Sequence, residues 1–436
     1  MEEMHQVVVI GGGFGGLNTV RALKQAPVSI TWLDQRNFHL FQPLLYQVAT
    51  GGLSPGNIAS PLRNIVKSQR NTRVLLAKVT DIVAPNRQVV LDEGGKIDYD
   101  TLVIATGAHH HYFGNEHWAE VAPGLKTIED AIEIRRRVLF AFEAAEMETD
   151  PREIRAWLTF VIIGGGPTGI ELAGSLGEIA NDTLEGDFRS INTHDARILL
   201  IEGMDRILGT FPPELSSSAV KALSRLGVTA RTGCMVTDIQ PDSVTIKCGD
   251  RTERIETHTV LWGAGVQASP LGRRLAESSG ARLDSAGRVI VEPDLTVEGH
   301  PEIFVIGDLA HFGHQTGKPL PGTASVAVQQ GQYAARLIRE RLRGRALPPF
   351  HFVDRGTMAT VGRAAAVADL PGIRLTGYLG WLVWLFVHLI NLVEFEDRLL
   401  VLIQWAWNYF TRNRGARLIT GEAPAKKSEK IPVGVR

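Results

Sequence analysis

Cysteine is scarce in this chain, which contains only Cys234 and Cys248 among its 436 residues. Two cysteines cannot supply the disulfide framework of a small secreted protein, and these two do not form the Cys-x-x-Cys spacing of a redox dithiol. We therefore expect both to be passive packing residues in a protein that works in a reducing, cytosolic environment.

An excess of basic residues is also lacking, because 46 Lys and Arg are balanced by 47 Asp and Glu. This balance disfavours nucleic acid as a partner. The N-terminus shows no basic segment followed by an apolar one, so it does not predict export by an ordinary signal peptide. No metal site is expected, since the adjacent His109, His110 and His111 cannot converge on one ion and no spaced fourth ligand is evident.

Glycine is plentiful, and the first glycine-rich turn lies almost at the N-terminus. The apolar run Val7–Ile10 predicts a buried strand, which leads into a G-x-G-x-x-G pattern and a predicted helix. The pattern is made by Gly11, Gly13 and Gly16. Such a turn lets a pyrophosphate approach the backbone at a helix N-terminus. A second predicted strand ends at Asp34, where a ribose-binding acid is expected, so we predict a dinucleotide site; an ordinary glycine turn is the alternative.

The chain repeats this pattern after the predicted strand Phe160–Ile163. The second G-x-G-x-x-G is made by Gly164, Gly166 and Gly169. A later strand ends in Glu202, and each copy closes with an apolar strand and a turn of small residues, Ala105–Gly107 in the first copy and Gly263–Gly265 in the second. With a length that suits two or three domains, the repeat predicts an α/β protein with two Rossmann-like dinucleotide-binding domains.

Other segments should complete these domains. Thr127–Glu148 and Thr323–Glu340 have helical spacing of apolar residues, the first as a link between the two units. The predicted strand Ile303–Ile306 ends at Asp308, at the sheet edge where nucleotides bind. Gln35–Thr50 mixes aromatics and amides without a regular period, so we expect a loop and short helix that line a pocket, with a plain packed connection as the alternative.

The C-terminal region is far more apolar. Tyr378–Val393 and Leu399–Phe410, the second interrupted by Gln404 and Asn408, flank the charged link Glu394–Arg398. Sixteen residues make a helix of about 24 Å, shorter than the roughly 30 Å hydrocarbon core, so neither run spans a membrane comfortably. We expect two helices that lie in one leaflet, with aromatic and basic residues at the headgroups. These are Trp381, Trp384, Trp405, Trp407, Tyr409, Arg412, Arg414 and Arg417. A helical pair buried in a dimer interface is the alternative.

Several segments together resemble the type II NADH:quinone oxidoreductases, which are non-pumping respiratory dehydrogenases. The segments are the two glycine motifs, His39–Pro55, Ile104–Ala108, Gly164–Gly174, Val305–Asp308, Gly356–Asp369 and the two apolar C-terminal runs. The glycine motifs alone indicate only the wider superfamily of two-dinucleotide flavoproteins. The Gln42–Thr50 segment and the C-terminal region make the resemblance specific.

The resemblance implies that the first unit binds FAD non-covalently and the second binds NADH. It places FAD at Gly11, Gly13, Phe14, Gly15, Gly16, Asp34, Gln42, Tyr46, Gln47, Ala105, Thr106, Gly107 and Asp308. It places NADH at Gly164, Gly166, Pro167, Thr168, Gly169, Glu202 and Gly265. Because the Glu202 carboxylate suits a ribose 2′-hydroxyl and repels a 2′-phosphate, we expect a preference for NADH over NADPH.

Three further residues are expected to act in catalysis. Glu171 is implied beside the nicotinamide, although an acid in the first turn of a helix is favoured by the helix dipole alone. Gln329 and Gln330 are implied in the wall of a quinone tunnel formed by Ala324–Gln330, the alternative being surface polar positions. The family usually has a glutamine where this chain has Ser325, so the expected hydrogen bonding to quinone rests on Gln329 and Gln330 alone.

The implied reaction is hydride transfer from NADH to FAD, followed by transfer of two electrons to a membrane quinone, without proton pumping. We expect an FAD domain at 1–125 and 268–350, a linker helix and NADH domain at 126–267, a membrane-anchoring domain at 351–420 and a disordered tail at 421–436.

Monotopic attachment to the cytoplasmic face of the cell inner membrane is expected, and a homodimer is left open. The rivals are a sulfide:quinone oxidoreductase, which needs cysteines near the flavin, and a non-catalytic flavoprotein scaffold regulated by nucleotides.

Overall fold

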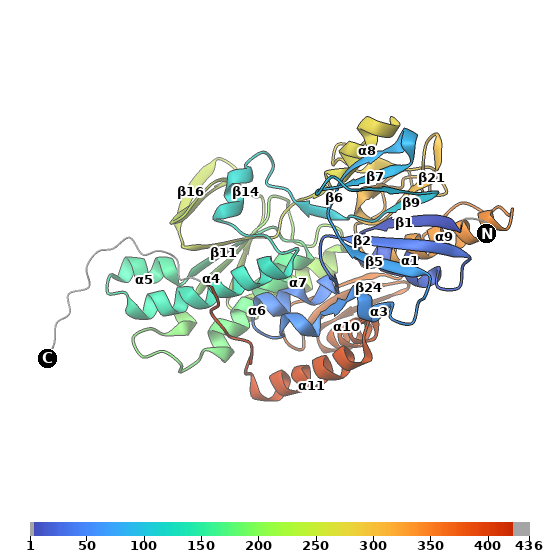
Figure 1. Cartoon of the computed structure of the whole chain (residues 1–436). Helices are drawn as coiled ribbons and strands as arrows, with labels where there is room; N and C mark the ends of the chain where they lie inside the picture. The colour runs from blue at the N-terminus through green and yellow to red at the C-terminus, as the bar shows by residue number, and fades with distance from the viewer. Residues whose placement is uncertain (1–3, 422–436) are drawn as a thin grey trace.

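The computed structural model describes residues 4–421. The predicted tail at 421–436 therefore lies outside the described residues, except for Gly421. Figure 1 shows two sheet-based units side by side, with the C-terminal helices along the lower edge of the molecule.

The first unit is built on a six-stranded sheet in the order β20-β21-β9-β1-β2-β5. Its strands are β1 (His5–Ile10), β2 (Val28–Asp34), β5 (Thr72–Leu76), β9 (Thr101–Ile104), β20 (Thr296–Val297) and β21 (His300–Val305). Every pair is parallel except β20 with β21. Because strands from both ends of this range share the sheet, the unit is discontinuous in sequence.

Helices and small sheets cover this sheet. The helices α1 (Phe14–Ala22) and α9 (Ala324–Leu342) pack against each other. The predicted helix Thr323–Glu340 is confirmed as α9, and the Thr323 side chain caps it. The smaller elements are α3 (Leu62–Ile65), α8 (Leu271–Ser279), the sheet of β6 (Val79–Val83), β7 (Gln88–Leu91) and β8 (Lys96–Asp98), and the pairs β3 (Phe38–Leu40) with β4 (Ala59–Pro61) and β19 (Val289–Ile290) with β22 (Ala310–His311). Side chains of α8, β6 and β7 join the core of the six-stranded sheet.

The second unit has a four-stranded parallel sheet in the order β13-β12-β11-β17. Its strands are β11 (Thr159–Ile163), β12 (Arg197–Ile201), β13 (Val228–Arg231) and β17 (Thr259–Trp262). Apolar side chains on one side of it pack with the helices α4 (Ile128–Met147), α6 (Pro167–Glu178) and α7 (Pro213–Arg225). Side chains on the other side pack with the antiparallel sheet of β14 (Cys234–Gln240), β15 (Ser243–Cys248) and β16 (Arg251–Glu256).

Two connections join the units. The first runs through α4 and α5 (Pro151–Trp157). The predicted linker helix is confirmed as α4, and it begins after Thr127, whose side chain accepts a hydrogen bond from the Asp130 amide. The second is the antiparallel pair of β10 (Ala108–His110) and β18 (Val266–Ala268), which places the end of the first glycine unit beside the end of the second.

The two cysteines form a disulfide, so the prediction that they are passive packing residues is wrong. Cys234 and Cys248 are direct cross-strand partners in β14 and β15. Their separation of 14 residues in the sequence gives no CxxC signal, and only the hairpin brings them together. The disulfide lies in the second unit, away from the glycine turn of the first.

The C-terminal part consists of the sheet of β23 (Thr357–Thr360), β24 (Ala366–Leu370) and β25 (Ile373–Thr376), followed by α10 (Gly377–Asn391) and α11 (Phe395–Thr411). Both predicted helices are present. The charged link is shorter than predicted, because Glu396 and Asp397 lie in the first turn of α11, where the helix dipole favours acids. Among residues 4–421 we find no helix with the length and apolar character needed to cross a membrane.

Candidate active site

The first glycine turn joins β1 to α1 and has the shape that a pyrophosphate needs. Gly11 has a φ of +109°, and a Cβ there would overlap the carbonyl oxygen of Ala105. A Cβ at Gly16 would overlap the carbonyl oxygen of Gly11, so this glycine lets the helix pack on the strand. At Gly13, by contrast, a Cβ would have no neighbour within 4 Å. The turn is therefore closed on its protein side and open in front of the α1 N-terminus.

The acid predicted for the adenosine ribose lies beside this turn. Asp34 ends β2, and its carboxylate accepts hydrogen bonds from the backbone N–H groups of Gly12 and Arg36. Burial raises the pKa of Asp34, while these two backbone bonds act in the opposite direction. The carboxylate is thus fixed at the sheet edge.

Two more loops meet the first turn at the carboxyl ends of β9 and β21. The β9 loop, Ala105–Gly107, packs on Gly11, and the β21 loop carries Asp308 in a short 3-10 helix, Gly307–Leu309. Gln330 of α9 is 1% exposed, and its Oε1 accepts a bond of 2.7 Å from the Gly307 amide. These three strand ends fit the FAD cradle expected from the sequence.

The second glycine turn repeats the geometry between β11 and α6. Gly164 has a φ of +102°, and a Cβ at Gly169 would overlap the Gly164 carbonyl oxygen, whereas a Cβ at Gly166 would have no neighbour within 4 Å. Glu202 follows β12, and its carboxylate accepts bonds from the amides of Gly165 at 2.6 Å and Met204 at 2.8 Å. The turn is therefore also open toward a pyrophosphate, with a fixed acid beside it. Pro167 and Thr168 form the first turn of α6.

Glu171 lies in the first turns of α6 and is partly buried. Burial raises its pKa from an ordinary 4.5 to about 8, although a backbone hydrogen bond from Thr360 favours the charged form. Farther along α6, Ser175 and Glu178 follow at helical spacing and line a cavity. A carboxyl group with a strongly raised pKa thus lies on the same face of α6 as this cavity.

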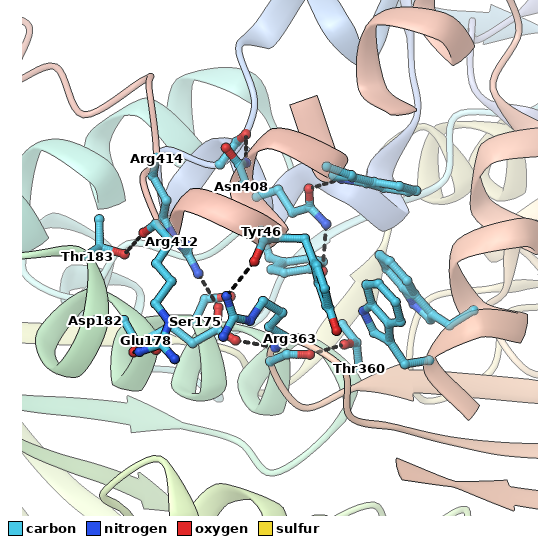
Figure 2. Close-up of a pocket in the computed structure, with 17 residues that line it drawn as sticks. Tyr46, Ser175, Glu178, Asp182, Thr183, Thr360, Arg363, Asn408, Arg412 and Arg414 are labelled. Atoms are coloured by element: carbon cyan, nitrogen blue, oxygen red, sulfur yellow. Dashed lines mark hydrogen bonds and ion pairs between the residues drawn. The ribbon is translucent and has the colours of Figure 1, made fainter. Parts of the chain in front are cut away.

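The cavity encloses about 730 Å³, part of it open to solvent, and it is formed by α2 (Leu45–Ala49), α6, β23, α10 and α11. Figure 2 shows its lining side chains, with Tyr46 between the charged groups of α6 and the aromatic rings of the C-terminal helices. Burial raises the pKa of Tyr46 well above its ordinary value. The cavity therefore reaches from the predicted flavin segment to the C-terminal helices.

Hydrogen bonds tie α11 to the predicted flavin segment. Trp405 Nε1 donates to Gln47 Oε1 at 2.7 Å, and Gln47 Nε2 donates to the Tyr46 hydroxyl at 2.9 Å. One turn later, Asn408 Nδ2 donates to the Gly52 carbonyl at 3.0 Å. In the sequence, only the polar residue Asn408 within an apolar run indicates that α11 contacts this segment. Trp384 and Trp405 do not indicate it, because tryptophans in an apolar helix are equally typical of a membrane interface.

The structure corrects two expectations about the headgroup region. Trp384 and Trp405 are 2% and 9% exposed, so they belong to the protein core and not to the lipid interface. The three basic residues form ion pairs with carboxylates that lie far from them in the sequence, although the Arg412 side chain stays 57% exposed. The ion pairs are Arg412 with Asp182 at 2.7 Å, Arg414 with Glu178 at 2.5 Å and Arg417 with Asp187 at 2.6 Å.

The remaining predicted residues lie elsewhere. Gln329 donates to Ser325 Oγ at 3.2 Å and exchanges two bonds with the backbone of Val353. Gln42 is exposed, and its Nε2 donates to the Lys126 carbonyl at 3.3 Å. Neither Gln329 nor Gln330 is among the residues that line the cavity. Gly265 follows β17 and has a φ of +70°.

The structure thus has two glycine turns, each with a hydrogen-bonded carboxylate beside it, in units joined by α4–α5 and by the pair of β10 and β18. This arrangement defines the class of two-dinucleotide flavoprotein oxidoreductases. Residues 5–331 match the family model of the pyridine nucleotide-disulphide oxidoreductases, and residues 355–413 match the NDH2 C-terminal domain. The chain is 45% identical to the type II NADH:quinone oxidoreductase NdhA of Mycobacterium tuberculosis over 427 residues, which cover 96% of this chain and 90% of that one. It is 44% identical to Ndh of the same organism, with 96% and 91% covered.

The chain therefore belongs to the type II NADH:quinone oxidoreductases. It is an FAD-dependent enzyme that oxidises NADH and reduces a quinone without pumping protons. Because quinones of this kind are dissolved in membranes, it is a membrane-associated enzyme.

Solved structures share the fold. The structure of NDH2 from Plasmodium falciparum in complex with NADH has a TM-score of 0.84 at 20% identity, covering 94% of this chain and 99% of that one. The sulfide:quinone oxidoreductase of Aquifex aeolicus has a TM-score of 0.71 at 19% identity, covering 94% and 92%. At these identities the likeness concerns the fold alone.

Proposed function

We propose that the enzyme is attached to the cytoplasmic face of the cell inner membrane through α10 and α11, and that quinone reaches the flavin through the cavity behind them. The observation that carries this proposal is the cavity itself, since one wall holds Tyr46 and Gln47 and another is formed by α10 and α11. NADH is made and used in the cytoplasm, so the dinucleotide units are assigned to that side.

The outer face of the two helices supports membrane attachment. Their exposed apolar side chains alternate with the buried ones at helical spacing, and together they form a membrane face, each member at least 49% exposed. The members are Tyr378, Leu379, Phe386, Ile390, Phe395, Leu399, Ile403, Trp407 and Phe410. A monomeric soluble protein rarely leaves such a continuous apolar surface in water. Lipid is the occupant we assign to it, in the manner of an interfacial helix pair.

The described residues have separable tasks in the reaction. FAD, when bound, accepts a hydride from NADH and passes two electrons to quinone. Gly11, Gly13 and Gly16 with Asp34 and Asp308 would hold it, and Gly164, Gly166, Gly169 and Glu202 would hold NADH. The protein therefore orients donor and acceptor on the flavin and excludes water between them.

Glu171 and the glutamines are assigned to the two ends of this reaction. Glu171 lies on the α6 face that leads from the second glycine turn to the cavity, and we assign it to the nicotinamide side. Gln330 supports the Gly307–Asp308 turn through the Gly307 amide, and Gln329 fixes Val353. We assign both glutamines to the acceptor half-reaction through their hold on the loops around the flavin. Direct contact with quinone is assigned to the cavity instead.

Membrane attachment is tested by a charged pair of substitutions, Phe386→Asp with Phe410→Asp, because both side chains are exposed and neither supports the core. The variant should keep bound flavin and turnover with a short-chain quinone, and should fail to sediment with vesicles. Met147→Asp is the matched control, since Met147 is 58% exposed but lies at the end of α4, outside the membrane face.

Two results would contradict the proposal. One is a double variant that sediments with vesicles as the wild type does. The other is a wild-type protein that needs no detergent and forms a dimer that the double variant dissociates, which would assign α10 and α11 to a dimer interface.

A further inference from the structure

Phe113 has an unusual combination of backbone strain and exposure. Its φ is +53°, a left-handed conformation that is a genuine outlier for a bulky side chain. The ring is 62% exposed, whereas the preceding Tyr112 is 4% exposed. The Asn115 side chain fixes this turn by donating to the carbonyl oxygens of Tyr112 at 3.3 Å and Phe113 at 3.4 Å. The chain thus holds an aromatic ring in water at a conformational cost, which points to a function.

The ring lies against the closing turn of the second dinucleotide unit. A Cβ at Gly265 would be 2.8 Å from Phe113 Cζ and 2.9 Å from Cε2, so the ring edge touches the Gly265 backbone. The two residues before Gly265 pack on the glycine-rich turn, because a Cβ at Gly164 would be 2.7 Å from the Ala264 nitrogen. Phe113 is therefore only one short turn away from the proposed pyrophosphate position.

The strand order tells which half of the dinucleotide is closer. In the sheet β13-β12-β11-β17, Glu202 follows β12 on one side of the glycine turn, and Trp262 ends β17 on the other. The Phe113 ring is 6.2 Å from the Trp262 ring, between centroids. A dinucleotide whose adenosine ribose meets Glu202 and whose pyrophosphate meets Gly164–Gly169 runs toward β17 with its nicotinamide half.

We propose that Phe113 contacts the nicotinamide half of NADH and so helps to hold the reacting ring toward the flavin. This inference rests on the assignment of NADH to the second glycine turn. The left-handed backbone of Phe113 holds the ring at the edge of the NADH site before the substrate binds. Contact with the substrate covers apolar surface that is otherwise hydrated, and this contribution favours binding because the backbone strain is already present in the free protein.

The test compares two ligands that share the adenosine half. Binding of NAD⁺ and of ADP to the FAD-loaded protein is measured by calorimetry, together with kcat and KM for NADH and for a short-chain quinone. Phe113→Ala should weaken NAD⁺ binding and raise the KM for NADH by about 3- to 10-fold, the range of one aromatic contact. The affinity for ADP and the KM for quinone should stay unchanged in Phe113→Ala. Phe113→Tyr, which keeps the aromatic ring, should have the wild-type affinity for NAD⁺ and the wild-type KM for NADH.

A second variant separates this role from a structural one. Phe113→Gly relieves the left-handed strain, so its Tm should equal or exceed that of the wild type while NAD⁺ binding is still weakened. Arg87→Gly is the matched control, because Arg87 also has a φ of +53° but lies in the first unit, and it should leave NAD⁺ affinity unchanged. Equal weakening of ADP and NAD⁺, or unchanged NAD⁺ affinity in Phe113→Ala, would overturn the inference. Failure of the wild-type protein to oxidise NADH would instead contradict the assigned activity.

Discussion

Replacing Trp405 with Phe should impair quinone reduction far more than replacing Trp407 with Phe. The two tryptophans lie two residues apart on α11 and face opposite ways, since Trp405 is 9% exposed and Trp407 is 61% exposed. Trp405→Phe keeps most of the apolar ring but removes the N–H that donates to Gln47 Oε1 at 2.7 Å. Trp407→Phe removes an N–H on the membrane face, so it is a matched control.

The size of the effect follows from the acceptor that is left behind. An unsatisfied acceptor costs about 1–3 kcal/mol when it is fully buried, which is the upper limit for the partly buried Gln47, and Gln47 also supports the Tyr46 hydroxyl at the cavity wall. If this whole cost is borne in the transition state for quinone reduction, kcat/KM for a short-chain quinone falls by roughly 5- to 150-fold. The rate of flavin reduction by NADH should remain close to the wild-type value, because the glycine turns do not contact Trp405.

Anaerobic stopped-flow spectroscopy measures the two half-reactions separately, and denaturant unfolding gives the stability. We expect Trp407→Phe to lie within about 0.5 kcal/mol of the wild type. The reasoning is refuted if the two variants are equally active with quinone, or if Trp405→Phe slows flavin reduction by NADH as much as flavin reoxidation.

Three further predictions concern the dinucleotide and acceptor sites. NADH should be preferred over NADPH by about a hundredfold or more in kcat/KM, because the fixed Glu202 carboxylate repels a 2′-phosphate, and comparable values would contradict this. Glu171→Gln should remove a pH dependence of stability. Because the pKa of Glu171 is about 8 in the folded protein against 4.5 ordinarily, the wild-type free energy of unfolding should fall as pH rises between these values, and that of the variant should not. Parallel pH profiles of the two proteins in denaturant unfolding would refute the raised pKa of Glu171. Gln330→Ala should slow flavin reoxidation by quinone and leave flavin reduction by NADH nearly unchanged, since it frees the Gly307 amide beside Asp308; stopped-flow traces with the opposite pattern would move Gln330 to the NADH side.

The parts of the fold that the sequence predicted are those whose signal is local. A glycine turn depends on the residues within it, so Gly11–Gly16 and Gly164–Gly169 could be read directly, as could the capped helix α4. The two C-terminal helices were also predicted from their apolar runs. The roles of individual site residues, by contrast, stay predictions, because they depend on bound FAD, NADH and quinone.

The errors concern pairs that are distant in sequence or hidden within a hairpin. Arg414 and Glu178 are 236 residues apart, so a basic tail read as lipid-binding is in fact an internal ion pair. Trp405 and Gln47 are 358 residues apart, and an aromatic residue in an apolar helix gives no sign of which side it faces. The disulfide was missed because Cys234 and Cys248 become neighbours only through the register of β14 with β15.

The most direct test of the activity and of its site is a redox cycle of the bound flavin in the purified protein. Anaerobic addition of NADH should bleach the flavin absorbance, and subsequent addition of a short-chain quinone should restore it at a rate sufficient for steady-state turnover. A protein that carries FAD but is not reduced by NADH, or that is reduced and then not reoxidised by quinone, would contradict the account.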